Sequence, residues 1–147
     1  MQFNIRNILP NDYNEIYELR NESYPNKYQE KKENFISKIN YEGCLVADLD
    51  GIIGYLISFP YSIGKSYPID NFYKTSEDAN CCYLYDICIT NDFRKKGIAK
   101  KLINTTLKRK EIFGLTSILN SEDFWKKFGF RSFFETSSKS KYMMLLK

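Results

Sequence analysis

The sequence contains no histidine among its 147 residues. This absence excludes Ser-His-Asp and Cys-His nucleophile pairs in their usual form, histidine-ligated zinc and any histidine proton shuttle. A reaction that moves a proton must therefore use carboxylates, tyrosines, cysteine or water.

The cysteines form no C-x-x-C pair, and their spacing would not arrange four thiolates around a metal. Free cysteine is among the most often buried residue types, so we interpret them as reduced core residues and expect no metal site. The four are Cys44, Cys81, Cys82 and Cys88.

Targeting and membrane-spanning segments are also missing. The N-terminus from Met1 to Arg6 lacks the basic and then apolar run of a signal peptide. No apolar stretch approaches the ~18 residues needed to span a bilayer. We therefore expect a soluble protein of a reducing compartment, the cytoplasm, without membrane contact.

The sequence does contain enough apolar material for one globular domain. Of its residues, 43% are hydrophobic and 27% are charged, which is a globular composition. The length suffices for one core and is too short for two domains of ordinary size. We expect one domain over residues 1–147.

Positive charge is concentrated in residues 94–110. This segment has eight basic residues and no acidic one, whereas the whole chain has a net charge of +4, so the remainder carries −4. Such a cluster fits a single polyanionic ligand better than a general attraction to nucleic acid or membrane, although a solvated helix face would look the same. The basic residues are Arg94, Lys95, Lys96, Lys100, Lys101, Lys108, Arg109 and Lys110.

Hydrophobic periodicity predicts a mixture of strands and helices. The Asp50-Gly51 pair is a strong hairpin signal, so we expect the two strands around it to pair antiparallel. The expected strands cover residues 2–6, 44–49, 52–59, 81–89, 115–119, 130–134 and 142–146. The expected helices lie after residue 10, at about 28–39, after residue 92, and from a cap at Asn120 or Ser121 to Gly129.

Residues 60–80 break this pattern with Pro, Gly, Ser, Asn and Asp between aromatic side chains. A structureless stretch of this length is unusual in a compact domain, so we expect it to have a function or to contain a short helix. Its acidic residues Glu77 and Asp78 would meet a cationic amine substrate or, alternatively, belong to a solvated loop.

A candidate phosphate site joins the apolar strand at Cys81 to Ile89, expected to be buried on both faces, to the following helix. The N–H groups of such a turn point at one spot, the helix dipole adds positive charge, and Gly97 lets a ligand approach the main chain. The spacing is neither that of a Walker A loop nor that of a Rossmann turn. The turn and helix start read Arg94-Lys95-Lys96-Gly97-Ile98-Ala99.

Two separated motifs resemble the signatures of the GNAT superfamily of acyl-CoA-dependent N-acetyltransferases. The family's cofactor signature, Arg/Gln-x-x-Gly-x-Gly/Ala after its fourth strand, matches Arg94 to Ala99, and its later signature, roughly Phe-Tyr-x-x-x-Gly-Phe, matches Phe124 to Phe130. The order of strands and helices is also similar, so the resemblance covers nearly the whole chain. It implies an α/β (α+β) fold with a central mixed, mostly antiparallel sheet flanked by helices.

Carried over position by position, the resemblance implies an acetyl-CoA site. The main chain of the strand would pair with the pantetheine arm, the N–H groups from Lys95 to Lys100 would hold the pyrophosphate, and Asn120 would bond the pantetheine. The charge of residues 94–110 independently fits a cofactor with three phosphate groups. The implied cofactor-binding residues are Ile87, Cys88, Ile89, Arg94, Lys95, Lys96, Gly97, Ile98, Ala99, Lys100 and Asn120.

One position departs from the family's pattern. The tyrosine that many members use as a general acid falls on Trp125, and an indole N–H is far too weak an acid to replace a phenol. We expect Trp125 to pack in the core. Water, or another tyrosine such as Tyr83, Tyr85 or Tyr142, would then protonate the leaving thiolate.

Asp86 is the candidate for proton removal. It interrupts an otherwise apolar strand, where a carboxylate needs either a partner or a purpose. Its position also resembles one where related enzymes often carry an acidic residue beside the acetyl group. The alternative is a structural hydrogen bond to a neighbouring loop or helix.

These observations lead to the hypothesis of an N-acetyltransferase. It would move an acetyl group from acetyl-CoA to a primary amine, in a small molecule or a peptide, by direct attack in a ternary complex, with Cys88 a core residue and no nucleophile. The alternative is a domain of the same fold that binds acyl-CoA without turnover. We expect no nucleic-acid partner, because residues 94–110 lack interleaved exposed aromatics.

Overall fold

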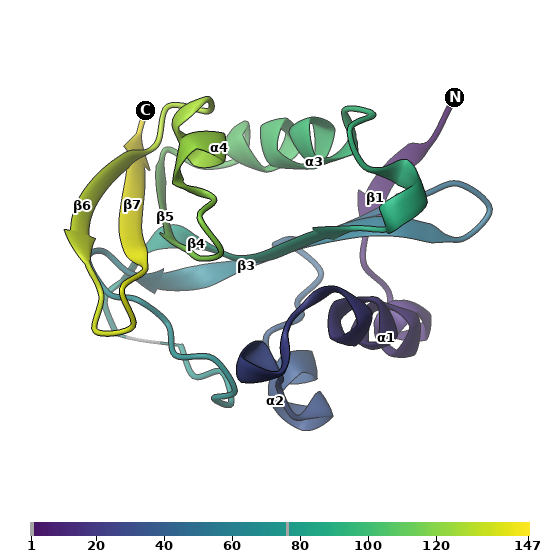
Figure 1. Ribbon diagram of the computed structural model, residues 1–147, viewed down its shortest axis with the longest axis horizontal. Helices are drawn as coiled ribbons and strands as arrows, with labels where there is room; N and C mark the ends of the chain where they lie inside the picture. The colour runs from purple at the N-terminus through teal and green to yellow at the C-terminus, as the bar shows by residue number, and fades with distance from the viewer. Residues whose placement is uncertain (1, 76) are drawn as a thin grey trace.

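The computed structural model describes residues 2–75 and 77–147, which form one sheet with helices on both faces (Figure 1). In the described residues the sheet has seven strands in the order β1-β2-β3-β4-β5-β7-β6. Among the strands of residues 2–75 and 77–147, only β4 and β5 are parallel neighbours, and every other pair is antiparallel. This confirms the expected mixed, mostly antiparallel sheet flanked by helices.

Most elements lie where the sequence predicts them. The strands are β1 (Asn4–Asn7), β2 (Cys44–Asp48), β3 (Ile52–Ser62), β4 (Ala79–Ile89), β5 (Ile112–Ser117), β6 (Arg131–Glu135) and β7 (Lys141–Leu146). The α-helices are α1 (Tyr13–Ser23), α2 (Lys32–Ser37), α3 (Ile98–Leu107) and α4 (Glu122–Lys126). Short 3-10 turns cover Pro10–Asp12, Asn26–Tyr28 and Asn91–Phe93.

The two faces of the sheet bury separate apolar clusters. Helices α1 and α2 cover one face and α3 and α4 cover the other, as Figure 1 shows. Ile16 of α1 and Phe35 of α2 lie in the first cluster. Ile98 and Leu102 of α3 and Trp125 of α4 lie in the second. No helix in the described part of the chain is both long enough and apolar enough to cross a bilayer.

The second helix is shorter than expected. The prediction of a helix over residues 28–39 is wrong at both ends, because α2 covers only Lys32–Ser37. Residues 29–31 are extended because Glu30 turns inward, where it is 3% exposed and pairs with Arg20 and Lys38. A buried carboxylate is tolerated only when it is paired, so these ion pairs outweigh the local helical pattern.

The segment expected as a loop over residues 60–80 is also shorter. Strands β3 and β4 extend into it, and its described residues between them contain no helix, while Ser76 lies outside the described residues. Hydrogen bonds hold it against the sheet, including one of 2.6 Å between the hydroxyls of Ser66 and Thr116. Glu77 and Asp78 are exposed, in agreement with a solvated loop.

Candidate active site

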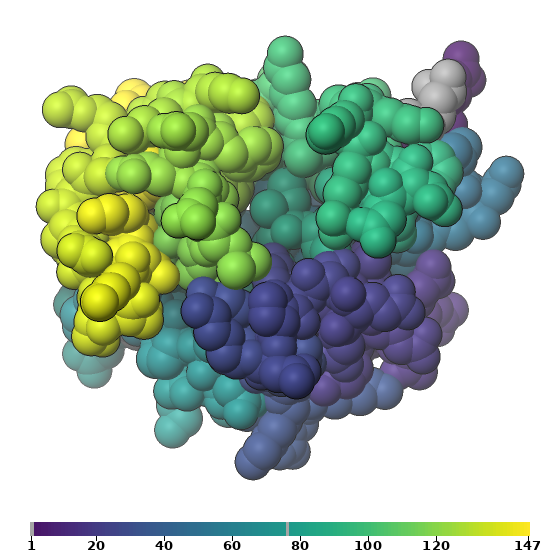
Figure 2. All heavy atoms as spheres, in the orientation of Figure 1, coloured from purple at the N-terminus to yellow at the C-terminus, as the bar shows by residue number. Residues whose placement is uncertain are grey.

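The parallel strands β4 and β5 separate partway along their length. They pair only from Cys82 to Leu84 of β4, opposite Phe113 to Leu115 of β5. Beyond Leu84, no described residue of β5 pairs with β4, because β5 follows β7 as far as Ser117. The main chain of β4 from Tyr85 to Ile89 therefore has a free edge, and Figure 2 shows the surface hollowed between the segment that leads into α3 and the segment around α4.

A β-bulge lies where the two strands diverge. Ile57 of β3 pairs with Asp86 and the next residue, Ser58, pairs with Leu84, so Tyr85 is the extra residue. Tyr85 and Asp86 consequently both point to the face of the sheet that α1 and α2 cover, where Tyr85 bonds to Glu30 and Asp86 to Tyr24. The expectation that the strand is buried on both faces is wrong here, because Tyr85 and Ile87 are only half-buried.

The free edge presents the main-chain groups of Ile87 and Ile89. The N–H of Thr90 donates to the carbonyl oxygen of Ile53 in β3 (2.9 Å), so the main-chain groups of Thr90 face β3. Successive residues of an antiparallel strand direct these groups to alternate sides. Ile87 and Ile89 therefore direct theirs to the free edge, whereas Cys88 directs its own toward β3.

Two side chains reach this free edge. Nε of Arg94 donates to the carbonyl oxygen of Ile89 (3.0 Å), which ties the turn after β4 back to the strand. The hydroxyl of Tyr24, at the end of α1, lies 3.3 Å from the carbonyl oxygen of Ile87. The edge is thus bordered by a guanidinium at one end and a phenol at the other.

The turn between β4 and α3 leaves open space beside its main chain. Lys95 and Gly97 have left-handed backbones, with φ of 62° and 82°, and Gly97 caps the helix. A Cβ built on Gly97 would meet no heavy atom within 4 Å. The N–H groups of the first helical turn have no carbonyl partner in the helix, so this end of α3 favours an anion.

The predicted cofactor-binding residues of this turn play different structural parts. The side chain of Ile98 is buried in the core, so that only its main chain faces the turn, and Ala99 is half-buried. The remaining side chains of the predicted set in this segment are exposed to solvent. They are those of Arg94, Lys95, Lys96 and Lys100.

The structure divides the basic segment between the two ends of α3. The helix has 10 residues, which corresponds to about 15 Å at 1.5 Å per residue. Arg94, Lys95, Lys96, Lys100 and Lys101 surround its N-terminal end, while residues 108–110 follow its C-terminal end. Only the first group lies at the candidate phosphate site, so the eight basic residues of this segment are not gathered at one place.

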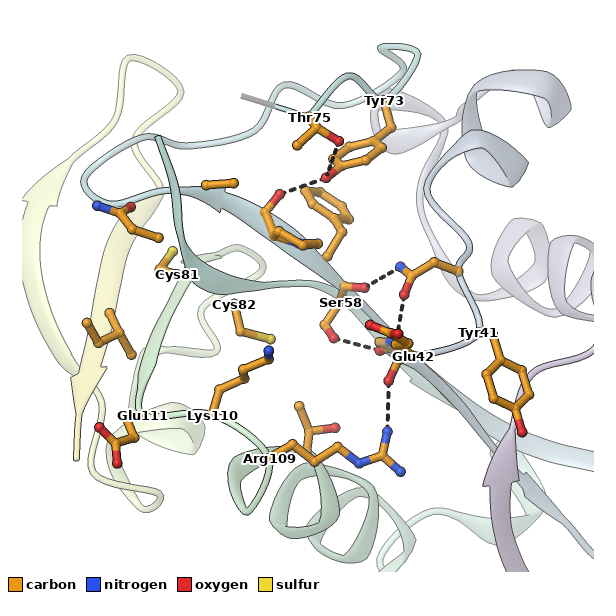
Figure 3. A pocket seen from close by; sticks show the side chains of 18 residues that line it. Tyr41, Glu42, Ser58, Tyr73, Thr75, Cys81, Cys82, Arg109, Lys110 and Glu111 are labelled. Carbon is orange, nitrogen blue, oxygen red and sulfur yellow. Dashed lines mark hydrogen bonds between the residues drawn. The ribbon is translucent and has the colours of Figure 1, made fainter. Parts of the chain in front are cut away.

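In the second group, Arg109 and Lys110 line a separate cavity of about 690 Å³ at the other end of β4. Nη1 of Arg109 donates to the carbonyl oxygen of Glu42 (2.8 Å), and Figure 3 shows the Lys110 ammonium beside Cys82. Phe59 and Cys81 also line it. This cavity is remote from the free edge of β4.

Asn120 lies in the turn that follows β5. Leu119 and Asn120 have left-handed backbones, with φ of 54° and 59°, so β5 ends at Ser117 rather than at the expected residue 119. Because β4 and β5 are parallel, Asn120 and Gly97 follow strand ends at the same edge of the sheet.

The expected cap of α4 is not observed. Ser121 occupies the N-cap position without a capping hydrogen bond, and its hydroxyl donates to the carbonyl oxygen of Ile118 (2.7 Å) instead. At the other end, Gly129 has a φ of 99° and donates its N–H to Lys126 (3.0 Å), as expected for a residue that terminates a helix.

Trp125 packs in the core, which confirms the prediction for this side chain. It is 7% exposed, and its ring centroid lies 5.1 Å from that of Phe124 and 5.6 Å from that of Phe130. The indole therefore belongs to the apolar cluster beneath α3 and α4.

Asp86 is buried beneath the free edge. Its carboxylate accepts hydrogen bonds from the hydroxyls of Tyr24 (2.5 Å) and Tyr55 (2.7 Å). Burial raises the pKa of Asp86 to about 6, although both hydroxyl bonds act in the opposite direction. Tyr24 could not be predicted as its partner from the sequence, because 62 positions separate the two residues.

Cys88 lies beside Asp86 on the same face of β4. Its thiol donates to the hydroxyl of Ser23 (3.0 Å), and burial raises the pKa of the Cys88 thiol to about 11. A thiol that stays protonated at neutral pH is a poor nucleophile. In the described residues, no group of three or more Cys, Asp or Glu side chains is placed to hold a metal ion.

A family model described as the acetyltransferase (GNAT) family matches residues 13–130. The chain belongs to this family. No curated protein matches the sequence.

Solved structures confirm the fold. The loading GNATL domain of CurA from Lyngbya majuscula has a TM-score of 0.82 at 11% identity, over 100% of this chain and 98% of that one. Diaminobutyrate acetyltransferase from Paenibacillus lautus, in complex with L-2,4-diaminobutyric acid and coenzyme A, has a TM-score of 0.70 at 13% identity, over 99% and 95%. A GNAT family acetyltransferase from Brucella melitensis in complex with acetyl-CoA has a TM-score of 0.62 at 18% identity, over 99% and 88%.

Proposed function

We propose that the chain is an acetyl-CoA-dependent N-acetyltransferase that acts on a primary amine. The observation that carries this proposal is the free edge of β4, bordered at one end by an open, basic helix N-terminus. An extended ligand with phosphates at one end fits such an opening, because strand edges and helix ends offer unpaired N–H groups.

In this proposal acetyl-CoA binds along β4 from the turn at Gly97 toward the bulge. The N–H groups between Lys95 and Lys100 hold the pyrophosphate, with the exposed lysines and Arg94 supplying positive charge. Ile87 and Ile89 pair with the pantetheine arm, and Asn120 bonds to it from the side of β5. Cys88 contributes side-chain packing, since its main chain faces β3.

The proposed reaction is direct attack of the amine on the thioester carbonyl. The N–H of Ile87 on the free edge would stabilise the oxyanion that forms on that carbonyl. Binding both substrates side by side replaces a covalent enzyme intermediate, in agreement with the raised pKa of the Cys88 thiol. Amine acceptors are supported by the relative that was solved with diaminobutyric acid, and the candidates here are small amines and peptides.

A second candidate function is acyl-CoA binding without turnover. It is favoured by the core position of Trp125, since no phenol occupies that place in the sequence. Both candidates share the cofactor site and differ only in whether an amine is acetylated.

An acetyl-CoA consumption screen distinguishes the two candidates. Thiol release would be followed with the purified protein over a mixed library of polyamines, amino acids, aminoglycosides and peptides, next to calorimetric binding of acetyl-CoA. The enzyme predicts thiol release that depends on at least one amine. Tight binding without release on any amine supports the binding module, and absence of binding contradicts both.

A further inference from the structure

Tyr24 places a phenol at the free edge of β4. It follows α1 directly, and its hydroxyl lies 2.5 Å from Oδ1 of Asp86 and 3.3 Å from the carbonyl oxygen of Ile87. Ile87 directs its main-chain groups to the edge where the thioester is proposed to lie. The Tyr24 hydroxyl is thus the link between that edge and the carboxylate buried beneath it.

The position of Tyr24 is fixed from several sides. Its N–H donates to the carbonyl oxygen of Arg20 (3.2 Å), and its own carbonyl accepts a hydrogen bond from Nε2 of Gln29 (3.0 Å). The guanidinium carbon of Arg20 lies 5.3 Å from the centroid of the Tyr24 ring. A side chain held in this way keeps its hydroxyl in place without first having to be ordered by a substrate.

Asp86 has no comparable access to the edge. It is 8% exposed, and its other oxygen accepts the hydroxyl of Tyr55, which is fully buried in β3. An acceptor amine at the edge would therefore meet the phenol of Tyr24 before it met the carboxylate of Asp86.

We propose that the Tyr24 hydroxyl is the catalytic proton-transfer group of this acetyltransferase and that Asp86 acts through it. The proposal rests on the proposed function of the same site. It accounts for proton transfer in a chain that has no histidine and that carries Trp125 in place of the family's usual tyrosine.

The proton that the amine loses can be passed to the leaving thiolate by groups of the same site. A neutral amine attacks the thioester carbon, so that the new C–N bond leaves an extra proton on the nitrogen. Tyr24 accepts that proton on its oxygen while it passes its own proton to Asp86. As the C–S bond breaks, the electron pair leaves on the sulfur of coenzyme A. Asp86 then returns the proton through Tyr24 to that thiolate, and the products are the amide and the free thiol.

The charged and polar groups around Tyr24 and Asp86 favour this proton transfer. Burial and the carboxylate of Asp86 raise the pKa of Tyr24 well above its ordinary value, so the phenol stays protonated and acts by exchange. Asp86 also faces Tyr55 of β3, the guanidinium of Arg20 and the carboxylate of Glu30. With a pKa of about 6, Asp86 is mostly ionised at neutral pH and is ready to accept a proton.

Tyr24→Phe tests the proposal, because it removes only the hydroxyl. We expect kcat to fall by about a hundredfold or more, which is the scale of a general acid–base contribution. The affinity for acetyl-CoA should stay within about twofold, since the phosphate turn is untouched. In the wild type kcat should rise with pH through an apparent pKa near 6, and this step should disappear in the variant.

Tyr55→Phe is the matched comparison, because it removes the other hydroxyl bonded to Asp86. Loss of that hydrogen bond should raise the pKa of Asp86 and move the pH profile of kcat upward, with most of the rate kept at the high-pH plateau. If Tyr24→Phe keeps the wild-type rate and profile, or if both variants behave alike, Tyr24 has only a structural role. A wild-type protein that acetylates no amine would overturn the proposed function itself, and the relay with it.

Discussion

The proposed phosphate site predicts that a negative side chain at Gly97 would weaken acetyl-CoA binding. A Cβ at this residue would extend into open space, at the point where the helix N-terminus favours an anion. Gly97→Asp would put a negative charge there, whereas Gly97→Asn has nearly the same size and tolerates the same left-handed backbone. Calorimetry should show acetyl-CoA binding at least about tenfold weaker in Gly97→Asp than in Gly97→Asn.

Comparing these two variants separates the effect of the negative charge from the effect of backbone strain, since both side chains must adopt the same φ of 82°. Far-UV circular dichroism would establish that both are folded. Equal affinities in two folded variants would mean that the pyrophosphate does not lie at this turn.

Asp86 should make stability depend on pH in a direction that can be stated in advance. Its folded-state pKa of about 6 lies above its ordinary value of 3.8, so between these pH values the folded protein binds a proton that the unfolded chain has lost. The contribution of Asp86 to the free energy of unfolding is therefore largest below pH 4 and is lost as pH rises through 6. The change is roughly 2–3 kcal/mol.

Asp86→Asn removes this dependence. Urea unfolding at pH 4 and at pH 7 should show that the variant gains stability relative to the wild type, because its free energy of unfolding minus that of the wild type is larger by roughly 2–3 kcal/mol at pH 7 than at pH 4. A difference that is the same at both pH values would mean that the carboxylate does not titrate in this range.

Trp125 packs in the core, and we expect it to have no role as an acid. Trp125→Phe should leave most of the turnover intact and should lower the free energy of unfolding by about 1–3 kcal/mol, because a smaller ring leaves part of the site unfilled. Thiol release and thermal unfolding of the same sample would measure both. A drop in turnover of more than about a hundredfold at normal stability would give the indole a direct role.

At the scale of elements, α3 carries two groups of positive charge with different surroundings. The group at its N-terminal end faces solvent beside the open turn, whereas Arg109 and Lys110 of the group that follows its C-terminal end line the separate cavity. Two double variants with equal net charge separate them. They are Lys96→Gln with Lys100→Gln, and Lys108→Gln with Lys110→Gln.

The first double variant should bind acetyl-CoA at least about tenfold more weakly, since charge-assisted contacts to phosphate contribute about 1.5–3 kcal/mol each. The second should change the affinity by no more than about twofold. Calorimetry at two salt concentrations would compare them. Equal losses in both variants would indicate a general field of the whole helix instead of local contacts.

Three elements form the opening between β4 and β5, namely these two strands and the segment that follows α1. The bulge at Tyr85 changes the direction of side chains along β4, and β5 remains with β7 instead of following β4. The segment after α1 then brings Tyr24 against the exposed edge. None of these elements forms the site alone, and each is fixed by contacts elsewhere in the fold.

At the scale of the whole molecule, the sequence predicts what is local in the chain. Gly97 and its neighbours form the expected turn because the backbone conformation and the charge there depend on adjacent residues. Most strands and helices follow from hydrophobic periodicity for the same reason. The predicted end of β5 at Leu119 is wrong, because nothing in the apolar pair Ile118 and Leu119 indicates the left-handed backbone at Leu119.

Contacts between distant segments could not be predicted in this way. The pair of Tyr24 and Asp86 joins residues 62 positions apart, and Tyr85 and Glu30 are 55 positions apart. The sequence indicates that Asp86 needs hydrogen-bond partners, because it is a carboxylate in an apolar strand. Which residues these partners are depends on how α1 and the following segment lie across β4. The tertiary arrangement supplies that information.

The proposed function requires acetyl-CoA to lie along the free edge of β4 with its phosphates at the start of α3. The most direct test is a titration of ¹⁵N-labelled protein with acetyl-CoA, followed through its amide resonances. We predict that the amides of Ile87 and Ile89, of residues 97–100 and of Asn120 shift together with one affinity, while those of Arg109 and Lys110 stay in place. Shifts gathered around the cavity at Arg109, or no shifts at all, would contradict the claim.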